Sequence, residues 1–270
     1  TSILHAVDGF EAQLRELRRL IEQQDSAGLT GLLSRAQSAR KHFTHMLAKT
    51  PYMETTTVTQ QFIVQAGGQL HGSLPIPGDK SVSHRSIMFG ALAEGVTHVS
   101  GFLEGEDALA TLQAFRDMGV VIEGPHLGKV VVYGVGLHGL ERAHQDLYLG
   151  NSGTSMRLLA GILAGQSFDV CLTGDASLSG RPMGRVVEPL KAMGALIEAS
   201  DQGRPPLHIR GNADLKGMTY PLPVASAQVK SAILLAGLYA SGETRVIEPE
   251  ITRDHTERML RQFGANVKVR

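Results

Sequence analysis

One helix-ending pattern occurs three times in this chain, at Gly119, Gly194 and Gly264. Each glycine closes a stretch with helical spacing and is followed at once by a short apolar run. Glycine at such an end adopts the positive φ angle that terminates many helices, at little steric cost. From residue 119 to 194 and from 194 to 264 the intervals are 75 and 70 residues. The pattern therefore predicts three related units, each with a helix that leads into a strand.

A second helix, rich in small residues, precedes each of these glycine-ended helices. It begins near Ser81, Ser152 and Ser226, and a basic side chain follows each start within about one turn. A unit of this length holds two helices and about four strands, which is too long for a solenoid repeat. We therefore expect a pseudo-three-fold α/β domain in which three helix starts converge on one face.

The first of these starts, Gly78-Asp-Lys-Ser-Val-Ser-His-Arg85, follows a Pro-Ile-Pro corner and is predicted to open a helix over residues 81–93. Unpaired backbone N–H groups and the helix dipole favour an anion at such a start. Ser81 and Arg85 are four residues apart and share one helix face. The stretch indicates a phosphate or carboxylate site; the alternative is an N-cap with two solvated cations.

Further basic residues gather near the other predicted helix starts. Arginine favours bidentate contacts to phosphate or carboxylate, whereas lysine supplies a mobile point charge. We expect a substrate with several anionic groups, or two anionic substrates bound together. For Arg157 and Lys230 two interpretations stay open, either ligand contact or fixing of neighbouring groups. The basic residues concerned are Lys80, Arg85, Arg157, Arg181, Arg185, Lys230 and Arg253.

The overall composition indicates a protein without a general nucleic-acid surface or a membrane span. Lys and Arg total 26, as do Asp and Glu, so the formal charge is zero and no global basic field exists. The longest apolar run, 232–240, is too short to cross a bilayer, and no signal peptide is visible. Cys171 is the single cysteine and excludes an internal disulfide. We expect a cytoplasmic protein, with Cys171 as an inert thiol in a strand core.

The first part of the chain differs from the rest. Leucines at helical spacing predict two helices, over 3–24 and 28–48, that form an αα-hairpin within residues 1–49. Two helices alone bury too little surface for a stable domain, so we expect them to need either a partner, as in dimerisation through residues 1–48, or a further upstream portion. Residues 50–60, with three consecutive threonines, indicate a linker.

Five ordered blocks resemble the 5-enolpyruvylshikimate-3-phosphate synthase family. They begin with Pro77-Gly-Asp-Lys-Ser-Val-Ser-His-Arg85 and continue with Leu149-Gly-Asn-Ser-Gly-Thr-Ser-Met-Arg157. Gly180-Arg-Pro-Met183, Ala225-Ser-Ala-Gln-Val-Lys-Ser-Ala232 and Arg253-Asp-His-Thr-Glu257 complete the set. Five blocks in order over about 200 residues are far more specific than any one of them.

The resemblance implies an inside-out barrel of two similar domains, each built from three βαβαββ units. Residues 79–270 are expected to form the N-terminal domain, with its last repeat truncated, and 61–78 a strand segment of the incomplete second domain. The implied reaction moves the carboxyvinyl group of phosphoenolpyruvate to the 5-hydroxyl of shikimate 3-phosphate and releases phosphate, with no metal or redox cofactor. Because the family's acid/base carboxylates lie in the second domain, we expect this chain alone to be an inactive fragment.

The resemblance also implies roles for individual residues. Lys80 corresponds to the lysine that contacts both substrates, and it is the electrostatic catalytic residue in this chain. The position of Gly153 corresponds to the space used by the inhibitor glyphosate. The substrate-binding residues implied are Lys80, Ser81, Arg85, Asn151, Gly153, Arg181, Ser226, Ala227, Gln228 and Arg253.

The N-terminal hairpin has a resemblance of its own. Its run from Phe10 to Arg40 is similar to the C-terminal helical tail of prephenate dehydrogenases, which implies a fused parent and explains a start other than Met. Two other functions stay open for the main region. One is a non-catalytic anion-binding or dimerisation module, and the other is the related UDP-N-acetylglucosamine enolpyruvyl transferase.

Overall fold

The computed structural model describes residues 15–23, 25, 26, 28, 63, 67, 71–74 and 76–269. The chain divides into two units, residues 1–71 and 72–270, and each is described by itself. In the first unit residues 15–22 are helical, in agreement with the helix predicted over 3–24. The linker and nearly all of the second predicted helix lie outside the described residues.

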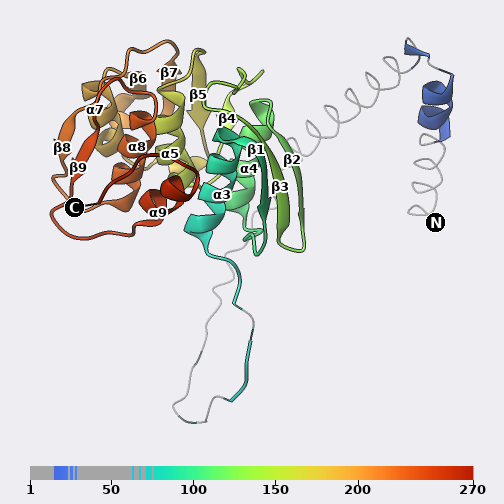
Figure 1. The fold of residues 1–270 in the computed structure, drawn as a ribbon, viewed down its shortest axis with the longest axis horizontal. Helices are drawn as coiled ribbons and strands as arrows, with labels where there is room; N and C mark the ends of the chain where they lie inside the picture. Colours follow the sequence, from blue (N-terminus) through green and yellow to red (C-terminus); the bar gives the residue numbers. More distant parts are fainter. Residues whose placement is uncertain are drawn as a thin grey trace. The chain divides into compact units, whose positions relative to one another are not determined.

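The second unit contains three successive groups of helices and strands (Figure 1). The first group is α3 (Lys80–Leu92), β1 (Glu94–Val99), α4 (Glu106–Asp117), β2 (Val121–His126) and β3 (Lys129–Val135). The second group is β4 (Leu147–Tyr148), α5 (Gly153–Leu163), β5 (Val170–Thr173), α6 (Ala176–Ser179), α7 (Gly184–Ala192), β6 (Leu196–Ser200), η1 (Asp201–Gly203) and β7 (Arg204–Arg210). The third is β8 (Thr219–Pro221), α8 (Ala227–Gly237), β9 (Arg245–Ile247) and α9 (His255–Gln262).

Each group builds one small sheet, and each type of pairing recurs in two of the three sheets. The strand orders are β1-β3-β2, β4-β5-β7-β6 and β8-β9. In the first two sheets the strand after the small-residue helix pairs antiparallel with the last strand of its group, as β1 does with β3 and β5 with β7. β4 pairs parallel with β5 across α5, and β8 pairs parallel with β9 across α8. The predicted α/β class and its three-fold order are therefore confirmed.

The glycines that suggested the repeat end their helices as predicted. Gly119, Gly194 and Gly264 have φ angles of 88°, 101° and 89°. They follow α4, α7 and α9, where the chain turns out of the helix. In the first two groups the next residues form β2 and β6, whereas residues 265–269 form no strand.

The core lies around α5 and α8, which Figure 1 places between the β1-β3-β2 sheet and the β8-β9 sheet. Nine of the eleven residues of α5 are buried, so this helix is apolar on nearly every side. A Cβ atom at Gly161 would stand 2.2 Å from the carbonyl oxygen of Ala232. Glycine is therefore required for the close approach of α5 to α8.

The strand predicted over 61–78 has no counterpart among its described residues, which are 63, 67, 71–74 and 76–78 and have no regular structure. The first long helix also begins one residue earlier than predicted, at Lys80, because Asp79 caps it. Within the described part of the chain, no helix is long and apolar enough to span a membrane.

Candidate functional site

Side chains cap the starts of α3, α5 and α8 in the same way. The carboxylate of Asp79 accepts a hydrogen bond from Val82 N at 2.8 Å. The hydroxyl oxygens of Ser152 and Ser226 accept from the backbone N–H groups three residues ahead, at 3.1 and 3.3 Å. Each cap satisfies one of the N–H groups that an anion would otherwise use. Recognition of an anion at these starts therefore depends mainly on side chains.

Arg85 joins the first group of elements to the third. Its side chain is almost fully buried, and Nε donates to Thr256 Oγ1 at 2.7 Å. Nη2 donates to Ser231 Oγ at 2.9 Å, and Nη1 donates to the carbonyl of Ser81 at 3.0 Å. A guanidinium has five N–H donors, so two remain for a ligand.

Arg253 lies beside this network and donates from Nη1 to Ser81 Oγ at 3.2 Å. Burial, and then repulsion from Arg253, lower the pKa of Arg85 to about 10. Two guanidinium groups that repel each other here would gain from a bound anion. We call Ser81, Arg85, Ser231, Arg253 and Thr256 the Arg85 cluster.

A second basic cluster links α5 to α8. Arg157 Nη1 donates to Gln228 Oε1 at 2.9 Å, and it also donates to the carbonyl of Gly153 at 3.2 Å. Arg181 donates to the side-chain oxygen of Asn151. A Cβ atom on Gly153 would lie 2.8 Å from Arg157 Nη1 and 3.1 Å from Arg181 Nη1. We call Asn151, Gly153, Arg157, Arg181 and Gln228 the Arg157 cluster.

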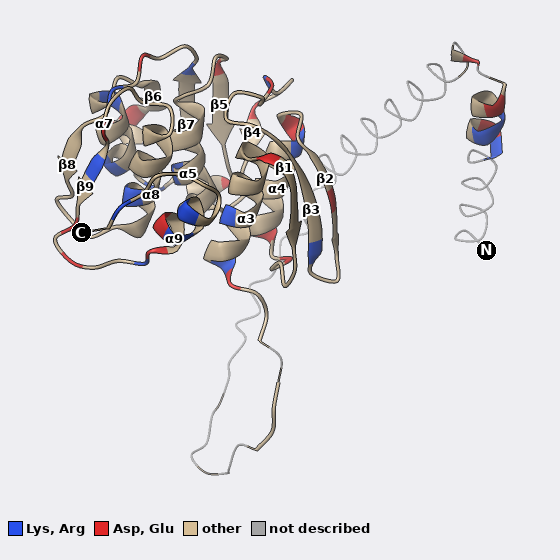
Figure 2. Cartoon of the chain, viewed as in Figure 1, with Lys and Arg blue, Asp and Glu red and all other residues tan. Residues whose placement is uncertain are grey.

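The Arg157 cluster also has an excess of positive charge. Burial lowers the pKa of Arg157, and repulsion from Arg181 and Arg185 lowers it further. The partners of the Arg157 guanidinium named above are an amide oxygen and a carbonyl, neither of which carries a full negative charge. Figure 2 marks the basic residues of α3, α5 and α8 on ribbons that are otherwise mostly uncharged. This cluster therefore favours a second anionic group.

The remaining predicted site residues have other positions. Lys80 pairs with the carboxylate of Asp107 on α4, and its side chain is about half exposed. Ser226 caps α8, and Ala227 begins this helix with its carbonyl accepting from Ser231 Oγ at 2.6 Å. The structure thus brings seven of the ten predicted residues into two clusters and leaves Lys80, Ser226 and Ala227 at adjoining helix starts.

Several residues of the site were missing from the predictions. Thr256 and Glu257 fall within the Arg253–Glu257 block, so their polar character at the start of a helix was an available signal. Ser231 falls within the Ala225–Ala232 block in the same way. Asp107 carried no signal in the sequence, because it acts through Lys80, 27 residues away in the chain.

Cys171 has the inert role that its sequence context indicates, and His84 is likewise a structural residue. Burial is the main cause that lowers the pKa of His84 to about 4, and its Nδ1 lies 2.7 Å from Thr111 Oγ1. Burial likewise raises the pKa of the Cys171 thiol to about 11. His84 is therefore neutral and Cys171 protonated at neutral pH, and neither is suited to acid/base or nucleophilic work.

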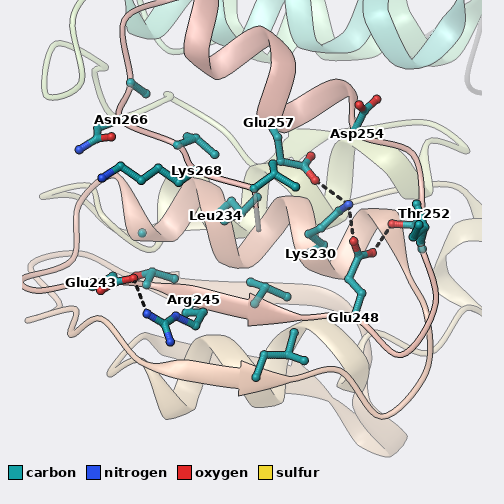
Figure 3. Close-up of a pocket in the computed structure, with 18 of the residues that line it drawn as sticks. Lys230, Leu234, Glu243, Arg245, Glu248, Thr252, Asp254, Glu257, Asn266 and Lys268 are labelled. Carbon is teal, nitrogen blue, oxygen red and sulfur yellow. Dashed lines mark hydrogen bonds and ion pairs between the residues drawn. The ribbon is translucent and has the colours of Figure 1, made fainter.

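Figure 3 shows a pocket between α8, β9 and α9. Among the ten implied substrate-binding residues only Arg253 lines it, together with Lys230, for which ligand contact was left open. Acidic side chains outnumber basic ones in its wall, five to four, so it does not attract anions as the two clusters do. Its charged lining residues are Lys230, Glu243, Arg245, Glu248, Glu250, Arg253, Asp254, Glu257 and Lys268.

Comparisons with known proteins bear on the same region. The family model of EPSP synthase (3-phosphoshikimate 1-carboxyvinyltransferase) matches residues 64–270. A 3-phosphoshikimate 1-carboxyvinyltransferase of Nitrosococcus oceani is 63% identical over 218 residues, which are 81% of this chain and 49% of that protein. The same-named protein of Alkalilimnicola ehrlichii is 67% identical over 208 residues, 77% of this chain and 47% of its own length.

A solved structure of EPSP synthase from Acinetobacter baumannii superimposes with a TM-score of 0.72 at 67% identity. The match covers 74% of this chain and 45% of that structure. The chain thus spans about half the length of the relatives it matches. The predicted fold class agrees with this structural match, and the chain belongs to the EPSP synthase family.

Proposed function

We propose that this chain carries the shikimate 3-phosphate side, and part of the phosphoenolpyruvate side, of an enolpyruvyl transferase active site. The observation that carries the proposal is the pair of basic clusters joined through α8, since Ser231 belongs to one and Gln228 to the other. Two substrates with separate anionic groups fit two separate centres of positive charge. The names of the matched relatives support the choice of these substrates.

The site residues divide between the two substrates. Ser81, Arg85 and Arg253 hold shikimate 3-phosphate, together with Ser226, Ala227 and Gln228 of α8. Asn151, Gly153 and Arg181 hold phosphoenolpyruvate. Lys80 contacts both substrates once its ammonium leaves Asp107. At Ala227 the methyl side chain cannot donate a hydrogen bond, so any contact there comes from the backbone.

The reaction is an addition followed by an elimination. An acid protonates the methylene carbon of phosphoenolpyruvate, and the 5-hydroxyl attacks the adjacent cationic carbon while a base takes the hydroxyl proton. The C–O bond to phosphate then breaks, and the proton lost from the methyl group restores the vinyl double bond. The two clusters contribute positioning and charge stabilisation, and the acid/base carboxylates are proposed to lie in a second domain.

The domain organisation is part of the proposal. Residues 79–270 form the N-terminal domain of the transferase, and 61–78 contribute to the second domain. Residues 1–49 form the tail of a fused prephenate dehydrogenase and act in dimerisation, and residues 50–60 link the two parts. The protein is proposed to work in the cytoplasm.

Calorimetric titration of shikimate 3-phosphate into the 270-residue chain tests the proposal. We expect saturable binding that weakens at least about tenfold in Arg253→Ala, the loss typical of one charge-assisted hydrogen bond. Arg210→Ala is the matched control, because Arg210 pairs with Glu198 on exposed strand positions outside both clusters. Its affinity is expected to equal that of the unmodified chain.

The same titration separates the alternatives. Binding of UDP-N-acetylglucosamine in place of shikimate 3-phosphate would assign the chain to the related transferase. A folded chain that binds neither ligand, but binds inorganic phosphate or self-associates, would favour the non-catalytic module and overturn the proposal.

A further inference from the structure

Lys230 is a buried lysine held between two glutamates. Its side chain is 5% exposed, and Nζ lies 2.7 Å from Glu248 Oε2 and 2.6 Å from Glu257 Oε1 (Figure 3). Glu257 is also buried, whereas Glu248 is partly exposed. We call these three residues the Lys230 clamp. Its ammonium is already neutralised by two carboxylates, so Lys230 is not available to bind an anionic ligand.

The clamp closes the loop that carries Arg253. Glu248 directly follows β9, and Glu257 lies in the first turn of α9. Residues 249–254 between them form neither helix nor strand, and Ile251 is fully exposed. No side chain caps the start of α9 at Asp254. A single ammonium on α8 therefore fixes both ends of a loop that has little packing of its own.

The position of α9 decides where Arg253 can reach. Thr256, next to Glu257, accepts the 2.7 Å hydrogen bond from Arg85 and lies 2.7 Å from Ser231 Oγ. Arg253, three residues earlier, extends to Ser81 Oγ at 3.2 Å. A shift in the start of α9 would change the distance between Arg253 and α3.

We propose that Lys230 is a positioning residue, which holds Arg253 at the start of α3 by clamping Glu248 and Glu257. The inference rests on the proposed function, in which Arg253 and Ser81 contact shikimate 3-phosphate. The sequence left two roles open for Lys230, ligand contact and fixing of neighbouring groups. The proposal assigns it the second.

The charge of Lys230 persists at neutral pH. Burial alone would lower the pKa of this ammonium, but the hydrogen bonds and charges of Glu248 and Glu257 together raise it above its ordinary value. Removing the lysine would leave two carboxylates without their counter-ion, one of them buried, and an uncompensated buried charge is strongly unfavourable. The loop would then move to bring the carboxylates to water.

Hydrogen–deuterium exchange of the unliganded 270-residue chain tests the clamp first. Lys230→Met should raise the exchange rate of the amides at 248–258 about tenfold or more, with exchange in β6 and β7 unchanged. Glu257→Gln is a milder second variant in case Lys230→Met does not fold. Lys216→Met is the matched control, because Lys216 pairs with Asp214 on an exposed surface at 3.7 Å. Equal exchange at 248–258 in all variants would overturn the clamp.

A double-mutant cycle then tests the role in binding. With Arg253 present, Lys230→Met or Glu257→Gln should weaken shikimate 3-phosphate about tenfold. In an Arg253→Ala background the same change should matter less than about twofold, because the two residues act together. Equal loss in both backgrounds, or unchanged affinity, would overturn the positioning role. If the unmodified chain fails to bind shikimate 3-phosphate, the proposed function and this role both fall, while the exchange data still decide the clamp.

Discussion

Arg85 Nε donates a 2.7 Å hydrogen bond to Thr256 Oγ1 across 171 residues of sequence. This bond ties the first group of elements to the third inside the core, where Arg85 is almost completely excluded from water. A buried charged donor that loses its acceptor pays the full desolvation cost of that group. The hydroxyl of Thr256 is therefore expected to contribute to stability as well as to the site.

Thr256→Val should lower the free energy of unfolding by about 1–3 kcal/mol, because it leaves Arg85 Nε without its acceptor. Thr256→Ser keeps the hydroxyl and should lose less. Urea denaturation followed by circular dichroism measures both. Thr219→Val, at an exposed position of β8, is the control and should change stability by less than about 0.5 kcal/mol. Equal stability of the Thr256→Val and Thr256→Ser chains would contradict the prediction.

His84 should make the chain sensitive to acid. The unfolded histidine takes up a proton near its ordinary pKa of 6.5, whereas the folded one does so only at about 4. The unfolded state therefore binds more protons between these values, and stability falls as the pH is lowered from 6.5 toward 4. The total effect is on the order of 3 kcal/mol.

Urea unfolding at pH 7, 6, 5 and 4 measures this dependence. His84→Gln should reduce the difference in stability between pH 7 and pH 4, and His126→Gln, at an exposed position of β2, should leave it unchanged. A pH dependence that is the same in the His84→Gln chain would show that another group causes it.

Alanine substitutions of the glycines that follow α7 and α9 distinguish the effect of backbone strain on stability from the effect of a steric clash. A Cβ atom on Gly264 would have no neighbour within 4 Å, whereas one on Gly194 would lie 2.7 Å from Asp214 O. Both glycines have positive φ. Gly264→Ala should therefore lower the free energy of unfolding by about 1 kcal/mol through backbone strain alone. Gly194→Ala should lower it by at least about 1 kcal/mol more, because its methyl group also meets Asp214 O. Chemical denaturation of the two variants measures the difference, and equal costs would contradict it.

Gly153→Ala should disturb the Arg157 cluster, because its methyl group would displace the guanidinium of Arg157 or Arg181. The expected result is binding of glyphosate weakened about tenfold or more in the presence of shikimate 3-phosphate, which corresponds to about 1.4 kcal/mol. Calorimetry measures the dissociation constant. Gly184→Ala is the control, since its Cβ would have only Glu188 Oε1 nearby, at 3.8 Å. An unchanged dissociation constant for glyphosate in Gly153→Ala would contradict the prediction that the inhibitor uses the space beside Gly153.

Local spacing was sufficient to predict much of the fold. The three glycines at 119, 194 and 264 set the repeat, because the end of a helix is decided by a few neighbouring residues. The proximity of Ser81 and Arg85 followed from helical periodicity, and the Arg85 guanidinium donates to the backbone carbonyl of Ser81 at 3.0 Å.

Partners distant in the sequence could not be predicted. Lys80 was expected to face a ligand and pairs with Asp107, while Lys230 pairs with both Glu248 and Glu257. These pairs depend on how α3 packs against α4 and α8 against α9, which no local pattern encodes. The helix starts expected near Ser152 and Ser226 are capped by these two serines, whereas Asp79, and not Ser81, caps α3.

A crystal structure of this chain with shikimate 3-phosphate tests the central claim most directly. The account predicts the ligand in the Arg85 cluster, with its oxygen atoms within hydrogen-bond distance of Arg253 and Ser81. The Arg157 cluster would lie beside it, free for the second anion. Shikimate 3-phosphate bound only in the pocket between α8, β9 and α9, or absent at a saturating concentration, would contradict the account.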